Sequence, residues 1–287
     1  MRARFVGVVV VATSLVLVLV IVLWYFMSSS RTLAFLGTVS SSSSSFQMVT
    51  VTNQPRDTRL GLLLTSASEK SGFVTEERVL LHCDPPFSWA KRLTLWKDYY
   101  STLPRDTVVL SVDAFDVVLL APKEEMMKKF IESGASLLFG YTDYCWPTNC
   151  DMCIRYLRER HPRLYSTELQ KMMYLCAGTY IGRAGYLADL LHKNPWTDDV
   201  DDQCYFATIF LQQPTSSIAM KLDEKNTIFQ NTTPTAIQQG YLSVDKEEKR
   251  PINNVTKTRP CVFHFDSYHP SHDELSYGYQ HLQGHGQ

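Results

Sequence analysis

Two carboxylates lie three positions apart, directly after an apolar segment of the chain. Residues 107–112 read TVVLSV, and Asp113 and Asp116 follow them. Such a segment is typical of a buried strand, and α/β sheets bind their ligands beyond the carboxyl ends of strands. Two carboxylates at that place could bind a hard divalent cation such as magnesium or manganese. A solvated aspartate turn that binds no metal would show the same spacing.

A histidine and a second acidic cluster could contribute to the same chemistry. His264 lies in the apolar segment 261–265 and could be a metal ligand or a structural histidine, so it needs partners from elsewhere in the chain. Asp201 and Asp202 precede the apolar stretch 204–211, where one of them could cap a helix. A carboxylate of this cluster could also accept the proton of an incoming acceptor hydroxyl.

The segments around these residues predict an α/β domain. We expect strands at 60–65, 107–112 and 136–140, a strand pair at 173–175 and 179–181, and helices at 89–100 and 122–133. Strands that alternate with helices along the chain indicate an α/β sandwich with a mainly parallel sheet. Asp113 would then lie at the carboxyl end of a strand.

The N-terminal segment has the length and composition of a membrane span. Residues 5–27 form an apolar run without a charged side chain, long enough for a transmembrane helix. Arg2 and Arg4 precede this run, and positive charge favours the cytosolic side. We therefore expect a cytosolic tail at 1–4, an uncleaved signal-anchor, and a type II membrane protein whose large domain is lumenal.

The chain changes composition twice after the predicted anchor. Residues 28–58 are rich in Ser and Thr, so they predict a stem with too little apolar content to fold. Residues 59–287 mix apolar and charged side chains and are long enough for one compact domain. The formal net charge of −1 gives no indication of a nucleic-acid partner.

The chain contains seven cysteines and two glycosylation sequons. Cys145, Cys150 and Cys153 have the spacing of plant-type iron–sulfur ligands, but a cluster needs a fourth cysteine and a reducing compartment. Disulfides or buried thiols agree better with a lumenal domain, which allows up to three disulfides. The sequons begin at Asn231 and Asn254 and fit the same compartment.

Six short strings occur in the same order as in a known family. They comprise residues 112–117, 144–147, 174–182, 201–203, 222–223 together with 228–231, and 262–264. Each string is short, but their common order is specific. The chain resembles the glycosyltransferase domain of the procollagen lysyl hydroxylase/glycosyltransferase family over about residues 60–264.

The resemblance implies a GT-A-like, Rossmann-type α/β/α sandwich that uses a UDP-sugar and manganese or another divalent cation. It implies that the metal ligands are Asp113, Asp116 and His264, that the donor contacts are Thr65, Lys91, Asp113 and Phe115, and that the sugar and acceptor side has Trp146, Asp201 and Asp202. The implied donors are UDP-galactose or UDP-glucose. The implied acceptor is hydroxylysine or galactosyl-hydroxylysine in collagen-like chains, in the Golgi or the endoplasmic reticulum.

The sequence also departs from the family in two places. The stretch between Thr65 and Trp96 is shorter, and residues 265–270 replace the family's glycine-rich, lysine-bearing diphosphate segment. These changes motivate an alternative, a non-catalytic binding or scaffolding protein with the glycosyltransferase fold. A metal-dependent phosphohydrolase would need a second metal cluster or a nucleophile, and the sequence indicates neither.

Overall fold

The computed structural model describes one compact part of the chain. It covers residues 45–142, 144–147, 150, 165–166, 171–214, 217, 219–232, 241–245, 247, 250–265, 276 and 280, all of which belong to the unit Ser45–Gln287. The predicted tail 1–4, the anchor 5–27 and most of the stem lie outside these residues. Among the residues that are described, no helix has the length and apolar character needed to cross a membrane.

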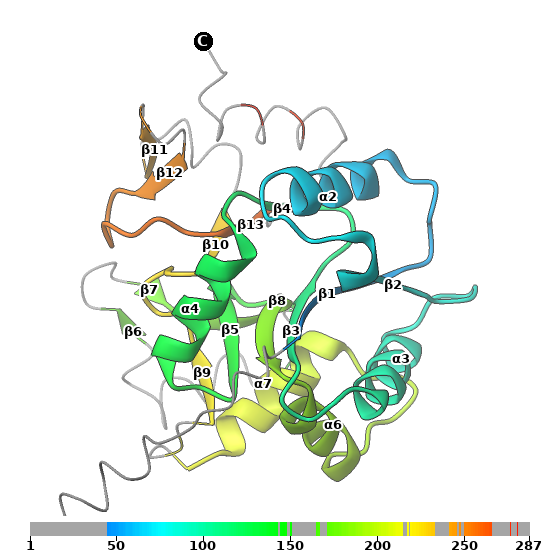
Figure 1. The fold of residues 1–287 in the computed structure, drawn as a ribbon. Helices are drawn as coiled ribbons and strands as arrows, with labels where there is room; N and C mark the ends of the chain where they lie inside the picture. Colours follow the sequence, from blue (N-terminus) through cyan, green and yellow to red (C-terminus); the bar gives the residue numbers. More distant parts are fainter. Residues whose placement is uncertain are drawn as a thin grey trace, which may run out of the picture. The chain divides into compact units, whose positions relative to one another are not determined.

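A mixed six-stranded sheet forms the centre of the domain (Figure 1). Its order is β2 (Arg78–His82), β1 (Phe46–Thr52), β3 (Val108–Val112), β8 (Tyr174–Arg183), β5 (Leu137–Thr142) and β9 (Met220–Leu222). β1 is parallel to β2 and β3, and β5 is parallel to β9, whereas β8 is antiparallel to both of its neighbours. The α/β class is confirmed. The prediction of a mainly parallel sheet is confirmed, since β8 alone in this sheet runs opposite to the other strands; the chain enters it at the end where it leaves β5, with Thr142 opposite Tyr174.

Helices cover both faces of this sheet and give an α/β/α sandwich. α2 (Thr58–Glu69) and α4 (Lys123–Ser133) pack on one face, with Leu63 and Phe130 in the core. α3 (Trp89–Thr102), α6 (Ala184–Lys193) and α7 (Asp202–Gln212) cover the other face, where Trp96 and Phe206 are fully buried. Apolar burial on both faces is what stabilises such a layered fold.

Several predicted elements are confirmed, one strand is wrong, and one predicted strand pair is a single strand. The expected strands at 107–112 and 136–140 and the expected helices at 89–100 and 122–133 correspond to β3, β5, α3 and α4. Gly134 ends α4 in the left-handed conformation, with φ of 64°, which glycine adopts without a steric penalty. The expected strand pair around Gly178 is instead one long strand, β8, whose pairing with β5 shifts register between Phe139 and Gly140.

The first strand lies earlier in the chain than the sequence suggested. Residues 60–65 belong to helix α2, and the true first strand is β1, inside the predicted stem. An apolar run of this length suits a helix as well as a strand, and here the side chain of Asp57 caps the helix by accepting a hydrogen bond from Arg59 N (2.9 Å). The stem therefore cannot extend to residue 58, because residues 46–58 are part of the folded domain.

A second, three-stranded sheet carries His264. It consists of β10 (Phe229–Thr232), β13 (Val262–Phe265) and β4 (Val117–Leu119). β13 is parallel to β10 and antiparallel to β4, and His264 is paired with Val117. This pairing brings His264 beside Asp116, whose carbonyl accepts a hydrogen bond from Phe265 N (2.8 Å). The other elements among the described residues are η1 (Thr75–Glu77), β6 (Tyr165–Ser166), β7 (Lys171–Met172), β11 (Leu242–Asp245) and β12 (Arg250–Asn253).

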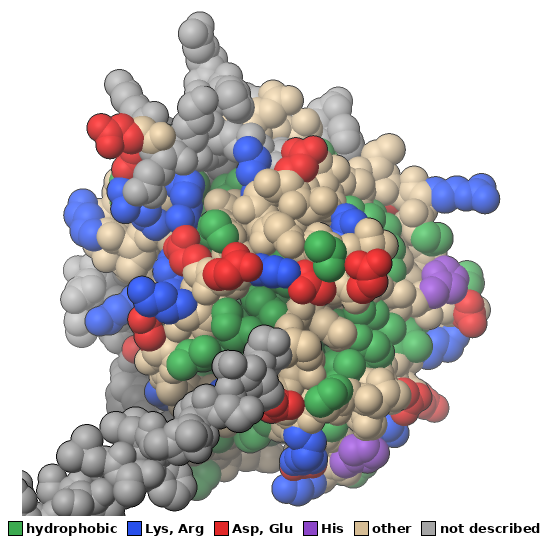
Figure 2. Space-filling model, in the orientation of Figure 1, with side chains coloured by type: hydrophobic (Ala, Val, Ile, Leu, Met, Phe, Trp, Pro, Cys, Tyr) green, Lys and Arg blue, Asp and Glu red, His purple; other side chains and the backbone are tan. Residues whose placement is uncertain are grey.

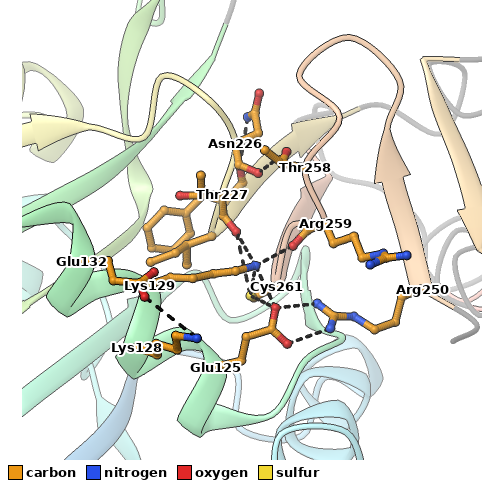
Figure 3. Close-up of polar contacts among 12 residues, drawn as sticks. Glu125, Lys128, Lys129, Glu132, Asn226, Thr227, Arg250, Thr258, Arg259 and Cys261 are labelled. Atoms are coloured by element: carbon orange, nitrogen blue, oxygen red, sulfur yellow. Dashed lines mark hydrogen bonds and ion pairs between the residues drawn. The ribbon is translucent and has the colours of Figure 1, made fainter.

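A polar network fastens this second region to α4 (Figure 3). Lys129 Nζ donates to the carbonyls of Thr227 (2.9 Å) and Arg259 (2.7 Å), which flank β10 and β13. Glu125 accepts two hydrogen bonds from Arg250 of β12, at 2.7 and 3.0 Å, and pairs with Lys129 at 2.7 Å. Because burial raises the pKa of the neighbouring Cys261 thiol to about 12, that thiol stays protonated in the network. Elsewhere on the face seen in Figure 2, acidic and basic side chains are interspersed.

Candidate active site

A pocket of about 550 Å³ opens where β1, β3 and β5 end. Its lining comes from several elements. These are the end of β1 and the residues after it (Val51, Asn53, Gln54), the starts of α2 and α3 (Arg59, Phe87, Trp89, Arg92), the turn 113–116, the end of β5 and the residues after it (Thr142, Tyr144, Trp146), the start of β8 (Cys176, Ala177, Gly178), the start of α7 (Asp201, Asp202, Gln203), and His264. The carboxyl ends of strands are where α/β sheets commonly bind ligands. The pocket is therefore the candidate active site.

Three potential metal ligands converge in this pocket. Asp113 and Asp116 follow β3, and one ligand atom from each of them lies within 4.8 Å of the others and of a His264 ring nitrogen. His264 Nε2 is 3.3 Å from Asp116 Oδ2 and 3.8 Å from Asp113 Oδ2. The turn 113–116 connects β3 of the central sheet with β4 of the second sheet, which also contains His264, so the fold itself assembles the group.

Two further observations show that these residues fit a divalent cation. Oδ1 of Asp116 is buried and has no hydrogen-bond partner, so this carboxylate has coordination capacity left. A Cβ atom on Gly178 would lie 2.6 Å from Asp113 Oδ2 and 2.7 Å from His264 Cε1, so only glycine leaves the space between these groups open. Two carboxylates and one imidazole form a donor set that suits manganese or magnesium.

The imidazole of His264 is buried among groups that favour its charged form. Burial lowers its pKa, but Asp116 and Cys176 raise it more, and the net pKa is well above the usual value. Nδ1 of the ring lies 3.4 Å from Cys176 Sγ, which leaves Nε2 facing the aspartates. A proton and a cation therefore compete for Nε2.

The two aspartates at the start of α7 differ in their environments. Asp201 is the N-cap, and its Oδ1 accepts a hydrogen bond from Cys204 N (3.1 Å), as the cap prediction expected. Asp202 is only 4% exposed. Burial raises its pKa to about 7 although the charge of Arg92 opposes this. Both residues line the pocket.

Two of the expected donor contacts lie elsewhere. Thr65 is exposed on α2, because the segment predicted as the first strand is a helix. Lys91 is not among the residues that line the pocket, and its Nζ donates to the carbonyls of Asp84 (3.2 Å) and Pro86 (2.7 Å). Successive residues of a helix are rotated by about 100°, so the next residue, Arg92, faces the pocket instead. Sequence reasoning missed Arg92, although its spacing of four from Trp96 indicates the buried face of α3.

The other expected residues do line the pocket. Phe115 lies between the two metal-ligand candidates, and the guanidinium of Arg59 is 5.0 Å from the centre of its ring. Trp146 is 45% exposed at the mouth of the pocket, near the exposed Tyr144. Sequence reasoning also missed Asn53 and Gln54, because it placed β1 in the stem.

Two of the three cysteines with iron–sulfur spacing are disulfide-bonded. Cys150 forms a disulfide with Cys204 of α7, and Cys145 is also disulfide-bonded, so neither thiol can ligate iron. Of the sequons, Asn231 lies in β10 and its side-chain amide atoms are buried. Asn254 lies just after β12 and its side chain accepts a hydrogen bond from Ser243 Oγ (2.7 Å).

Known sequences and structures resemble the chain as follows. The human multifunctional procollagen lysine hydroxylase and glycosyltransferase LH3 is 30% identical over 173 residues, which is 60% of this chain and 22% of that protein. The Drosophila melanogaster procollagen-lysine,2-oxoglutarate 5-dioxygenase is 33% identical over 162 residues, 55% of this chain and 21% of that protein. The chain thus spans about a fifth of the length of these relatives. Mouse xyloside xylosyltransferase 1 superposes with a TM-score of 0.46 at 10% identity, over 79% of this chain and 99% of the other, a likeness too low to carry an argument.

The match to a protein family is more extensive. Residues 91–277, more than half of the chain, match the PLOD GT domain. This region begins at the start of α3 and includes the turn with Asp113 and Asp116, the start of α7 and His264. The α/β/α sandwich of the described residues agrees with the fold class that the resemblance implied. The chain belongs to the PLOD GT domain family of glycosyltransferase domains.

Proposed function

We propose that this domain is a metal-dependent hexosyltransferase that moves a hexose from a UDP-sugar to a protein acceptor. The observation that carries the proposal is the convergence of Asp113, Asp116 and His264 on one point of a pocket at the strand ends. Membership of the glycosyltransferase family supports the reaction class. Manganese is the proposed cation, since it accepts both carboxylate and imidazole ligands.

The metal site would serve the departure of the diphosphate. The three ligands would hold a cation that acts as a Lewis acid on the leaving group. Asn53 and Gln54, at the end of β1, take over the place first assigned to Thr65, and we assign them to the nucleoside together with Phe115. Arg59 would add positive charge above the Phe115 ring.

The acceptor side would lie at the aromatic mouth of the pocket. Trp89, Tyr144 and Trp146 are 38%, 42% and 45% exposed, and aromatic faces of this kind can pack against a sugar or an extended peptide. As the acceptor oxygen bonds to the anomeric carbon, the bond to UDP breaks and the acceptor proton passes to a carboxylate. We assign that role to Asp201, because Asp202 is buried behind the mouth and paired with Arg92.

The substrates are proposed from the relatives. The name procollagen lysine hydroxylase and glycosyltransferase points to a lysine of procollagen as the acceptor. From the resemblance we propose hydroxylysine or galactosyl-hydroxylysine of collagen-like chains as acceptor and UDP-galactose or UDP-glucose as donor. The expected replacement of the diphosphate segment falls mainly on residues 266–270, outside the described part of the chain. The alternative of a non-catalytic binding protein therefore gains no support from the described residues.

Membrane anchorage by residues 5–27 remains part of the proposal, with the domain in the lumen of the Golgi or endoplasmic reticulum. The disulfide between Cys150 and Cys204 agrees with an oxidising compartment. Protease treatment of sealed microsomes should spare the domain until detergent is added. Digestion of the domain without detergent would show that it faces the cytosol, opposite to the proposed orientation.

A screen of UDP-sugars tests the proposed reaction. Purified full-length protein in detergent should hydrolyse UDP-galactose or UDP-glucose slowly when manganese is present, and transfer should be faster with a hydroxylysine-containing collagen peptide. Asp113→Asn is the matched inactive control. Nucleotide binding with neither hydrolysis nor transfer across the screen would favour the non-catalytic alternative.

A further inference from the structure

The guanidinium of Arg92 lies at the back of the pocket, between two carboxylates from different elements. Arg92 is only 5% exposed although it carries a charge. Its Nη2 donates to Asp113 Oδ1, and its Nη1 lies 3.2 Å from Asp202 Oδ2, within ion-pair distance although not aligned as a hydrogen bond. One side chain thus connects the end of β3 with the start of α7.

Aromatic rings hold this guanidinium in place. Its Cζ lies 4.4 Å from the centre of the Trp96 ring and 5.6 Å from that of Trp89. Trp96 is fully buried in the core. A planar guanidinium stacks on such rings and presents its donors in a fixed fork, which an ammonium group cannot do. The orientation of Arg92 is therefore set by the core, before any ligand binds.

This orientation has a consequence for Asp113. Arg92 occupies Oδ1, so the carboxylate cannot rotate freely, and Oδ2 is directed toward His264 Nε2 at 3.8 Å. We propose that Arg92 is a positioning residue that presents Oδ2 of Asp113 to the cation while it also pairs with Asp202. The inference rests on the metal site of the proposed function and not on sugar transfer.

A simple counter-charge would behave differently. If Arg92 only balanced the four carboxylates of the pocket, lysine would replace it without loss. Removal of its charge would then strengthen cation binding, because a nearby positive charge repels a cation. A positioning role needs the planar fork, so lysine should fail although it keeps the charge. Loss of a group that orients a metal ligand typically weakens metal binding by about 10–100-fold.

Manganese titration of the full-length protein in detergent separates the two roles. We expect Arg92→Lys to weaken manganese affinity by about 10-fold or more, measured by calorimetry without nucleotide. Arg105→Lys is the matched control, because Arg105 makes an exposed ion pair with Asp189 (2.7 Å). The manganese affinity of this variant should equal that of the wild type. Wild-type affinity in Arg92→Lys, or tighter binding in Arg92→Met, would overturn the proposal.

A double-mutant cycle excludes a general loss of structure. If Arg92 acts through Asp113, then Arg92→Lys should have no further effect on manganese affinity in an Asp113→Asn background. Additive effects would contradict the positioning role. Unfolding temperatures of the metal-free variants check folding. If Arg92→Lys does not fold, Arg92→Gln, which retains a planar donor, is used in its place.

If the wild type binds manganese but transfers no sugar, only the proposed reaction fails. If it binds no manganese, this inference fails too.

Discussion

Nε2 of His264 lies 3.3 Å from Oδ2 of Asp116, and the two residues belong to neighbouring positions of an antiparallel strand pair. His264 is paired with Val117 of β4, so the histidine is held beside the aspartate by backbone hydrogen bonds. The pair is therefore rigid. Its charge state, unlike its geometry, depends on whether a proton or a cation occupies Nε2.

Proton release on metal binding follows from this pair. Because the pKa of His264 is raised well above its usual value, the imidazole carries a proton at pH 7, which a cation must displace. Manganese affinity should increase with pH until the pH exceeds this raised pKa, and about one proton should be released per cation at pH 7. Calorimetry in buffers of different ionisation enthalpy measures the number of protons released per bound cation.

His264→Gln provides the comparison for that experiment. The variant keeps a polar side chain of similar reach but has no titratable group, so proton release at pH 7 should fall to near zero. Manganese should also bind more weakly, since an imidazole ligand is lost. Equal proton release in the variant and the wild type would show that the proton comes from another group and that His264 is structural.

Removal of one carboxylate should affect the metal site far more than the fold. Asp113→Asn and Asp116→Asn keep the side-chain shape but remove a charged ligand. We expect each to abolish manganese-dependent UDP binding in a calorimetric titration, with little change in the unfolding temperature. Donor affinity that stays at the wild-type level in both variants would mean that the two aspartates form a solvated turn.

The metal-ligand candidates could be predicted from the sequence because each lies next to a strongly apolar strand. β3 and β13 are buried along their whole length, so their patterns identify them as strands. The strand patterns alone do not bring His264 to Asp113, since β13 belongs to a different sheet. The order of the family strings supplied that juxtaposition, and the structure agrees with it.

The errors have local physical causes. β1 alternates polar and apolar residues directly after a serine-rich block, while the more apolar segment 60–65 forms a helix whose Leu60 and Leu63 face the core. Apolar content alone therefore selected the wrong strand, and with it Thr65. The assignment of a donor contact to Lys91 is off by one position from Arg92, because only the packing of α3 decides which of these two adjacent basic side chains is buried.

Gly178→Ala tests the space at the centre of the site. The added Cβ would lie 2.6 Å from Asp113 Oδ2, so the carboxylate would have to move away from the cation. We expect loss of manganese binding with a smaller effect on stability. Gly61→Ala is the control, because nothing lies within 4 Å of its Cβ and alanine in a helix adds about 0.5–1 kcal/mol of stability. Normal manganese affinity in Gly178→Ala would show that the ligands lie farther apart in solution.

The last prediction concerns Glu125, which joins α4 to β12 (Figure 3). Burial raises the pKa of Glu125, but the hydrogen bonds from Arg250 and Lys129 outweigh this and lower it to about 2. A carboxyl group whose pKa is lower in the folded state stabilises the fold above its unfolded pKa, near 4.3, and loses this contribution as the pH falls toward 2. Because Glu125 is partly exposed, we expect its charge to contribute roughly 1–2 kcal/mol to the free energy of unfolding.

Glu125→Gln should therefore be less stable than the wild type at pH 6, and the difference should shrink as the pH falls from about 5 toward 2. Urea unfolding at several pH values gives the free energies. Glu132→Gln is the control, because its pair with Lys128 is exposed and long, at 3.9 Å, and contributes little. A stability difference that stays constant over this pH range would mean that Glu125 acts through packing and not through its charge. In that case the charge-dependent attachment of this region to α4 would have to come from the hydrogen bonds that Lys129 donates to the carbonyls of Thr227 and Arg259, which flank β10 and β13.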